Sequence, residues 1–184
     1  MPGFDFPQLD ERTRVLMVKE FALDDSSPKG VYRGRRLNSE GERIYLSALL
    51  VSLQEGTGIS LQAQLEPVPG TLWVPEIINK IGRRSPTPYT AAQTLAEGEF
   101  NRYYMRAICR RALEEGDGTV TVRRAKLVEQ SRPDDEVRVS VGDILDADAV
   151  LQDIRLHPGE DTALGMPRGP NSGLSLEFLP PTAK

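Results

Sequence analysis

Apolar side chains recur at the spacing of one helix face along much of the chain, and this pattern predicts five helices. Asp10 is placed to cap the first helix, and Ser39 followed by Glu42 has the spacing of a capping box at the start of the second. Ser60 is expected to begin a short third helix. The predicted helices cover residues 11–21, 39–54, 60–65, 90–115 and 143–156.

Alternating apolar residues predict short strands, most of them in the second half of the chain. The predicted strands cover residues 31–32, 119–128, 137–141 and 174–178. Helices therefore come first, and strands with one helix follow, which is typical of an α+β fold. We expect a single domain over residues 1–184, with about four helices around the long helix 90–115 and a small, mostly antiparallel sheet from the C-terminal half.

The segment 66–89 lacks a regular pattern and is interrupted by prolines at 67, 69, 75, 86 and 88. Loops of this length are uncommon inside a compact domain and usually serve a function or contact a partner. We expect an extended arm here, built either as a short hairpin or as an irregular excursion. The terminal residues 1–9 and 179–184 are expected to be extended tails, rich in proline.

The helix predicted over residues 90–115 is apolar around most of its circumference, so we expect it to be buried among several neighbours. One narrow polar stripe holds Glu99, Arg102, Arg106 and Arg110 at spacings of three, four and four. The arginines either bind an anionic partner, such as a phosphate backbone or an acidic protein surface, or pair with some of the chain's 27 Asp and Glu residues. Internal pairing is the commoner arrangement, and the sequence leaves both open.

Two further clusters of arginine lie in predicted loops. They are the most plausible contacts for nucleic acid or another anionic partner, although charged loop side chains are more often simply solvated. The two clusters contain Arg33, Arg35, Arg36, Arg83 and Arg84. With Arg102, Arg106 and Arg110, these five complete the set of candidate partner- or anion-contacting residues.

Composition narrows the classes of partner. The chain carries a formal net charge of −4, whereas proteins that bind nucleic acid without sequence preference are usually basic. The single cysteine, Cys109, excludes an internal disulfide and fits a reducing compartment. The N-terminus lacks the pattern of a signal peptide, and the stretch 45–53 is far shorter than the ~20 apolar residues that cross a bilayer. We therefore expect a cytoplasmic protein without membrane contact.

The residue types that form common catalytic and metal sites do not occur in a convincing pattern. Cys109 and His157 make a weak Cys–His pair, because the cysteine lies inside the buried helix. One cysteine and one histidine are too few for a conventional zinc site. The glycine-rich loop 165–173 lacks the Gly-Lys-Ser/Thr ending of a phosphate-binding loop and precedes a strand. We expect no catalytic residues, no cofactor and no metal.

The sequence thus favours a non-enzymatic structural or assembly protein. The type we expect is a small subunit of a larger particle, such as a neck, tail or capsid-associated component of a phage virion or phage-like assembly. Its partners would be other protein subunits, in a homo- or hetero-oligomer. The alternative is a nucleic-acid-associated or regulatory protein that uses the basic loops and the stripe of Arg102, Arg106 and Arg110, which we call the arginine ridge. A third hypothesis is an enzyme of unfamiliar type, with arginine, tyrosine and carboxylate groups converging from distant segments.

Overall fold

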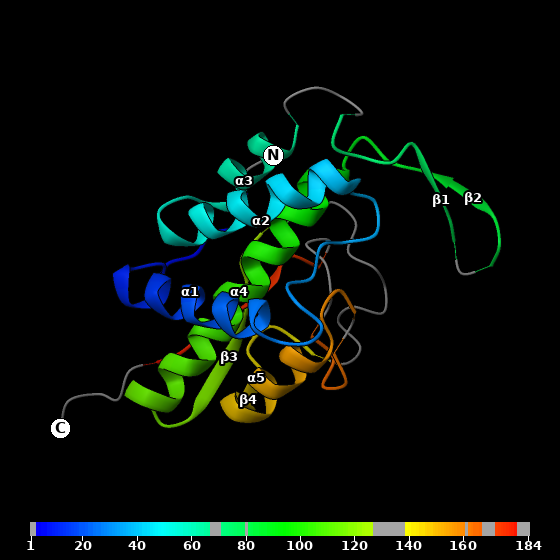
Figure 1. Cartoon of the computed structure of the whole chain (residues 1–184). Coiled ribbons are helices and arrows are strands. Elements are labelled where there is room, and N and C mark those ends of the chain that lie inside the picture. Colours follow the sequence, from blue (N-terminus) through cyan, green and yellow to red (C-terminus); the bar gives the residue numbers. More distant parts are fainter. Residues whose placement is uncertain are drawn as a thin grey trace.

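A computed structural model describes residues 3–66, 71–79, 81–126, 139–160, 162–166 and 172–179. It contains helices and short antiparallel strands, so the expected α+β class is confirmed (Figure 1). The helices are α1 (Glu11–Asp25), α2 (Ser39–Gln54), α3 (Gly58–Leu65), α4 (Ala91–Glu115) and α5 (Ala147–Leu156). The strands are β1 (Glu76–Ile78), β2 (Arg84–Pro86), β3 (Thr119–Arg124), β4 (Ile144–Asp146) and β5 (Leu174–Glu177).

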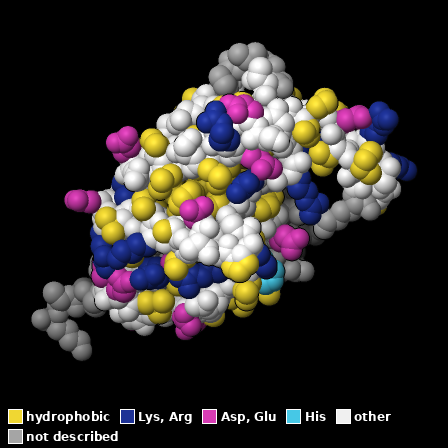
Figure 2. Space-filling view, in the orientation of Figure 1, with side chains coloured by type: hydrophobic (Ala, Val, Ile, Leu, Met, Phe, Trp, Pro, Cys, Tyr) yellow, Lys and Arg dark blue, Asp and Glu magenta, His cyan; other side chains and the backbone are white. Residues whose placement is uncertain are grey.

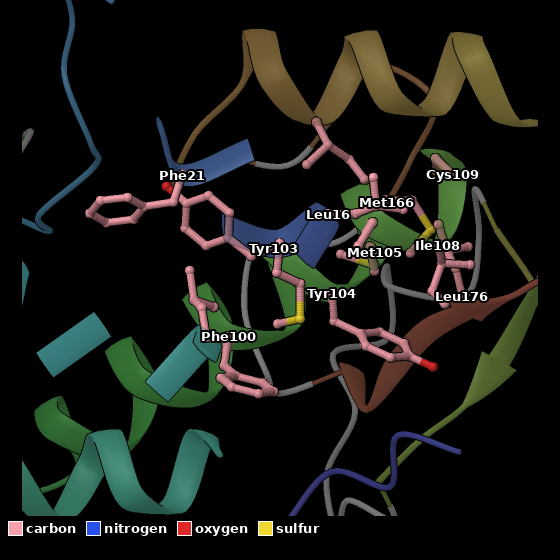
Figure 3. Close-up of a cluster of buried hydrophobic side chains, with 14 of the residues drawn as sticks. Leu16, Phe21, Phe100, Tyr103, Tyr104, Met105, Ile108, Cys109, Met166 and Leu176 are labelled. Atoms are coloured by element: carbon pink, nitrogen blue, oxygen red, sulfur yellow. The ribbon is translucent and has the colours of Figure 1, made fainter. Parts of the chain in front are cut away.

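Helix α4 is the axis of the molecule, as its apolar circumference predicted. It packs against α1, α2 and α3 and also against α5, β3 and β5 (Figure 1). Figure 3 shows the core that results, where Phe100, Tyr103 and Ile108 of α4 meet Leu16 of α1 and Leu176 of β5. These side chains are buried because every face of α4 has a neighbouring element, and the whole hydrophobic cluster is organised along this one helix.

The helix starts follow local capping chemistry, with two corrections to the sequence prediction. Asp10 caps α1 as expected, since its carboxylate accepts a hydrogen bond from the Thr13 amide. At α2 the cap is Asn38 and not Ser39, because the Asn38 side chain accepts from the Gly41 amide. At α3 the cap is Thr57, which forms a reciprocal capping box with Ser60. Both corrections move the start by only one to three residues.

The main sheet has three antiparallel strands in the order β4-β3-β5. The strand predicted at 137–141 is wrong where it is described, because Val139 is buried outside any strand and the chain turns at Gly142, with φ +96°. The helix predicted from residue 143 begins later, at Ala147. Residues 144–146 form strand β4 instead, and the Asp146 carboxylate caps α5 by accepting from the Ala149 amide.

The segment 66–89 contains the second sheet, the antiparallel hairpin of β1 and β2. Figure 1 shows this hairpin extending away from the body of the molecule. Of the two alternatives for the segment, the structure therefore shows a hairpin. We call residues 74–87 the arm. The strand predicted at residues 31–32 is absent, and Val31 instead joins the hydrophobic core.

The N-terminal residues 3–9 are irregular but lie against the core. The Phe6 ring packs on Phe100 and Tyr104, with ring centroids 5.3 and 4.5 Å apart. The Gln8 side chain donates to the Phe178 carbonyl over 2.8 Å and accepts from the Phe178 amide over 3.1 Å. This segment therefore holds the strand β5 side of the sheet against α4. The predicted C-terminal tail lies, from residue 180 onward, outside the described residues.

Replacing Gly41 by alanine is expected to lower the free energy of unfolding by about 1–3 kcal/mol, the usual cost of overpacking. Helix propensity alone predicts a gain of about 1 kcal/mol for this change. The loss should prevail because a Cβ at Gly41 would lie 2.1 Å from the Leu72 carbonyl oxygen, which accepts a hydrogen bond from the Asn38 amide. Urea unfolding measures the change, with Ser47→Ala on the exposed side of α2 as control. A more stable Gly41→Ala variant would contradict the prediction.

Candidate functional site: a buried arginine network and an exposed arm

Arg106 is the centre of the arginine ridge and is fully buried. Its Nε donates to Glu20 Oε2 over 2.8 Å, and its Nη1 donates to Asp24 Oδ2 over 2.7 Å. Glu20 and Asp24 are one turn apart in α1, so they present two carboxylates to the same guanidinium. The pairing of Arg106 with α1 is therefore internal, and in this structure the guanidinium has no access to a partner.

Glu20 joins three helices. Besides Arg106, it accepts from Arg155 of α5, whose Nη2 lies 2.6 Å from Oε1, and from Arg110, whose Nη1 lies 3.3 Å from the same oxygen. Burial by itself raises the pKa of Glu20, but the hydrogen bond from Arg155 and the charges of Arg106 and Arg155 outweigh burial and lower it. The carboxylate is thus held in its charged form between α1, α4 and α5.

Arg102 lies about one turn before Arg106 in α4 and belongs to the same network. Its Nη2 donates to Glu99 Oε2 over 2.6 Å, and its Nη1 lies 3.5 Å from Asp24 Oδ2. The guanidinium lies over the Tyr103 ring, 4.6 Å from the centroid, and the Tyr103 hydroxyl donates to Asp24 Oδ2 over 2.8 Å. Burial raises the pKa of Glu99, and Arg102 opposes that rise. The ridge thus has carboxylates of its own chain along its whole length.

Sequence reasoning identified the ridge but missed Glu20, Asp24 and Arg155. A signal for the first two was present, since Leu16, Glu20 and Asp24 follow one another every four residues and therefore share the buried face of α1. Acidic residues at buried helical positions need a cationic partner. The network supports the geometry of α1, α4 and α5 and contains no group free to react with a substrate among the described residues.

Lowering the pH from neutral to about 3.5 should destabilise the protein through this network. The pKa values of Glu20 and Asp24 lie below their ordinary values of 4.5 and 3.8, so both carboxyls bind protons more weakly in the folded state. Their stabilisation is therefore complete above pH 4.5 and is lost as the pH falls through the lowered values. Glu99, with its raised pKa, acts in the opposite direction.

The measurement is urea unfolding at both pH values. Glu20→Gln should be less stable at neutral pH and should lose less on acidification, because the replaced group no longer titrates. Glu55→Gln, at the exposed end of α2, is the matched control and should keep the full dependence. An acid dependence that is unchanged in Glu20→Gln would contradict the assignment.

The loop arginines differ in their surroundings. Arg33 pairs with Glu42 over 3.1 Å, and Arg84 pairs with Glu76 across the hairpin over 2.8 Å. Arg36 instead holds the arm: its Nη1 donates to the carbonyls of Ser85 and Pro86 over 3.1 and 2.9 Å. The two remaining side chains, Arg35 and Arg83, are exposed and form no ion pair within the described residues.

The arm carries large apolar side chains into solvent. Ile78 is 65% exposed and Ile81 is 73% exposed, and Tyr89 at its base is almost fully exposed. Figure 2 shows apolar and basic side chains together on this projecting part of the surface. Exposed isoleucines beside arginines are typical of surfaces that become buried against another molecule. The arm is therefore the strongest candidate interaction site.

The arm is tied firmly to the body at its base. The Val74 amide donates to the Arg36 carbonyl over 2.8 Å, and Leu37 and Trp73 form an isolated antiparallel bridge. The Trp73 indole donates to the Leu65 carbonyl over 3.0 Å. The direction of the arm is thus fixed by Arg36 and Leu37 and by the end of α3, while Ile78 and Ile81 are exposed.

The structure places the candidate chemical groups of the sequence in different surroundings. Cys109 is fully buried in α4, and burial raises its pKa, so the thiol stays protonated. His157 lies with Nδ1 2.8 Å from Asp153 Oδ1 at the end of α5. No cluster of three or more metal-ligating side chains occurs in the ranges that the structure describes. Most of the loop 165–173 lies outside those ranges.

A cavity of about 190 Å³ lies between the N-terminal segment, α3 and α4. It is lined mainly by apolar side chains, and this volume would hold a molecule about the size of benzene. The two acids in its wall are neutralised, because Asp5 pairs with Arg123 over 2.9 Å and Glu97 pairs with Lys126 over 2.6 Å. The residues that line it include Phe4, Phe6, Leu9, Ile59 and Phe100.

Comparison with models of protein families, with curated proteins and with solved structures gives no match for this chain. Within the described ranges, every helix is too short or too polar to cross a lipid bilayer.

Proposed function

We propose that this chain is a non-enzymatic structural protein that assembles with other protein subunits through its arm. The observation that carries the proposal is the exposure of Ile78 and Ile81 on a hairpin that projects from the body. An isolated two-stranded hairpin is only marginally stable in water, and burial of its apolar side chains against a partner would stabilise it. An intracellular particle such as a phage virion or phage-like assembly is the setting that fits a small subunit of this kind.

The buried ion-pair network also supports this proposal. An arm transmits position between subunits only if the body that bears it is rigid. The body is fixed by Glu20, which joins α1 to α4 and α5, while Arg36 fixes the base of the arm. The polar groups of the interior are thus used to hold geometry, which is the property that an assembly subunit requires.

The test is the mass of the protein in solution, measured by sedimentation over a range of concentrations. We expect association above the 20.4 kDa monomer. The double variant Ile78→Ser, Ile81→Ser should remain monomeric at the same concentrations. Ile59→Ser, which changes an equally exposed isoleucine of α3 outside the arm, is the control and should associate normally. A protein that stays strictly monomeric at high concentration would overturn the proposal.

A second candidate function is binding of nucleic acid, which is favoured by Arg35 and Arg83, both exposed and without an ion pair among the described residues. It predicts binding of labelled DNA or RNA whose affinity falls with salt, and a shallower salt dependence in Arg35→Gln, Arg83→Gln. Arg43→Gln, an exposed arginine paired with Glu40, is the matched control. No retention on DNA or RNA at low salt would exclude this function.

A further inference from the structure

We infer that the arm of one copy adds to the free edge of strand β4 in a second copy, so that β1 and β2 extend the three-stranded sheet of the neighbour. This inference rests on the proposed function and names the surface that receives the arm.

The open edge of the arm is strand β1. The Asn79 amide donates to the Arg83 carbonyl and the Thr87 amide donates to the Pro75 carbonyl, both over 2.9 Å. In an antiparallel pair these inward positions alternate with outward ones, so Glu76 and Ile78 direct their backbone groups away from β2. No described residue pairs with that outward edge.

The opposite edge of the arm is closed. Pro86 of β2 has no amide hydrogen to donate, and its carbonyl already accepts from Arg36 over 2.9 Å. Strand addition to the arm must therefore use the β1 side.

The main sheet has one closed edge and one open edge as well. Along β5, the Leu174 carbonyl accepts from the Asn101 side chain, and the Phe178 backbone is paired with the Gln8 side chain. Along β4, by contrast, no outward partner occurs in the described part of the chain. There the Asp143 carbonyl and the Ala147 amide face β3, which leaves the intervening backbone groups of Ile144 directed outward.

The side chains at the two open edges are complementary. Ile144 is 70% exposed and Val141 is also exposed, so β4 offers apolar surface for Ile78 and Ile81 of the arm. Three exposed carboxylates lie at β4 without an ion pair among the described residues, and Arg83 of the arm likewise forms no ion pair among them. These carboxylates belong to Asp143, Asp146 and Asp148. Opposite charges beside an apolar contact select the partner and set its orientation.

The pairing must occur between copies. Figure 1 shows the arm and β4 at well-separated parts of the molecule, and the base of the arm is fixed by Arg36. Because the donor surface and the acceptor surface are different, the contact is head-to-tail. Repetition of such a contact gives a closed ring or an open helical filament, according to whether the rotation closes.

The test mixes two variants, each defective in one surface. The arm variant is Ile78→Ser, Ile81→Ser. The edge variant is Ile144→Pro, which removes an outward amide that the β3 ladder does not use. Each variant alone should sediment as a monomer. An equimolar mixture should form a dimer of twice the monomer mass, since the intact arm of one variant meets the intact β4 edge of the other. Ile144→Lys serves as a second edge variant if Ile144→Pro fails to fold, as judged by circular dichroism.

The outcomes separate this inference from the proposed function. If the edge variants associate as well as the unmodified protein while the arm variant stays monomeric, the arm binds elsewhere and the inference is overturned, but the proposed function stands. If the mixture of two monomeric variants fails to form a dimer, the contact is not arm to β4 edge, and the inference is likewise overturned. If the unmodified protein never associates, the proposed function fails first.

Discussion

Replacing Arg106 by methionine is expected to lower the free energy of unfolding by about 3–5 kcal/mol, the range for removing one partner of a buried ion pair. The change leaves the buried Glu20 carboxylate with two arginines instead of three and deprives Asp24 of its closest guanidinium. Methionine fills much of the volume, so the loss reports on charge and hydrogen bonding more than on a cavity. Urea unfolding at neutral pH, followed by circular dichroism, measures it.

The control for this prediction is Arg43→Met. Arg43 pairs with Glu40 over 2.6 Å, but this pair lies on the exposed side of α2, and exposed pairs contribute little. We expect no large change in the unfolding midpoint. If Arg106→Met were as mild as Arg43→Met, the network would not hold α1 against α4, and its assignment as the rigid support of the body would be wrong.

Replacing Phe100 by alanine is expected to cost about 3–5 kcal/mol, as for other buried phenylalanines. Phe100 is fully buried where the N-terminal segment, α3 and α4 meet (Figure 3). Its ring supports Phe6, and its Cβ lies 3.5 Å from the position that a Cβ on Gly58 would occupy. The truncation would also open the space between these elements into the adjacent cavity of about 190 Å³. The surrounding structure therefore has little means of closing the gap.

Phe100→Leu is the matched variant, because it keeps most of the apolar volume and should cost much less than the truncation. Chemical denaturation of the three proteins gives the comparison, and the dependence of unfolding on denaturant should stay the same if the native fold is kept. Equal losses for alanine and leucine would show that the aromatic contact with Phe6 matters more than the volume.

The long helix could be predicted from sequence because its signal is local and repeated. Twenty-five residues with apolar positions on most faces require burial on every side, and α4 is buried in this way. For the segment 66–89 the sequence left a hairpin as one of two alternatives. Prolines and glycines mark turns, but they do not determine which strands pair. Local patterns thus specified where elements lie better than how they pair.

Strand β4 shows why the boundary of α5 was misplaced. Ile144, Ala147, Leu151 and Ile154 have helical spacing, and the last three are buried in or at the start of α5. Ile144 is exposed in β4, because the chain there is extended to pair with β3 and Asp146 provides a better cap than Asp143. A periodicity rule assigns apolar residues to the core, so it cannot predict an isoleucine that is exposed.

The candidate site was harder to predict because it depends on tertiary contacts. Arg106 and Glu20 are 86 residues apart in the sequence. From sequence alone, any of the chain's 27 acidic residues could have been the partner of Arg106. Only the packing of α1 on α4 selects Glu20 and Asp24. The arm itself was expected, but the exposure of Ile78, Ile81 and Ile144 could not be predicted, because a sequence does not state which apolar residues are left outside.

The single tryptophan and the single cysteine of the chain lie in different parts of the molecule. Trp73 is half-buried at the base of the arm, with its indole held by the Leu65 carbonyl, whereas Cys109 is enclosed by the core on α4. Tryptophan emission will therefore follow rearrangement at the arm, and modification by thiol reagents will follow opening of the core. The protein thus carries two separate native reporters, which distinguish a change at the base of the arm from unfolding without any change to the sequence.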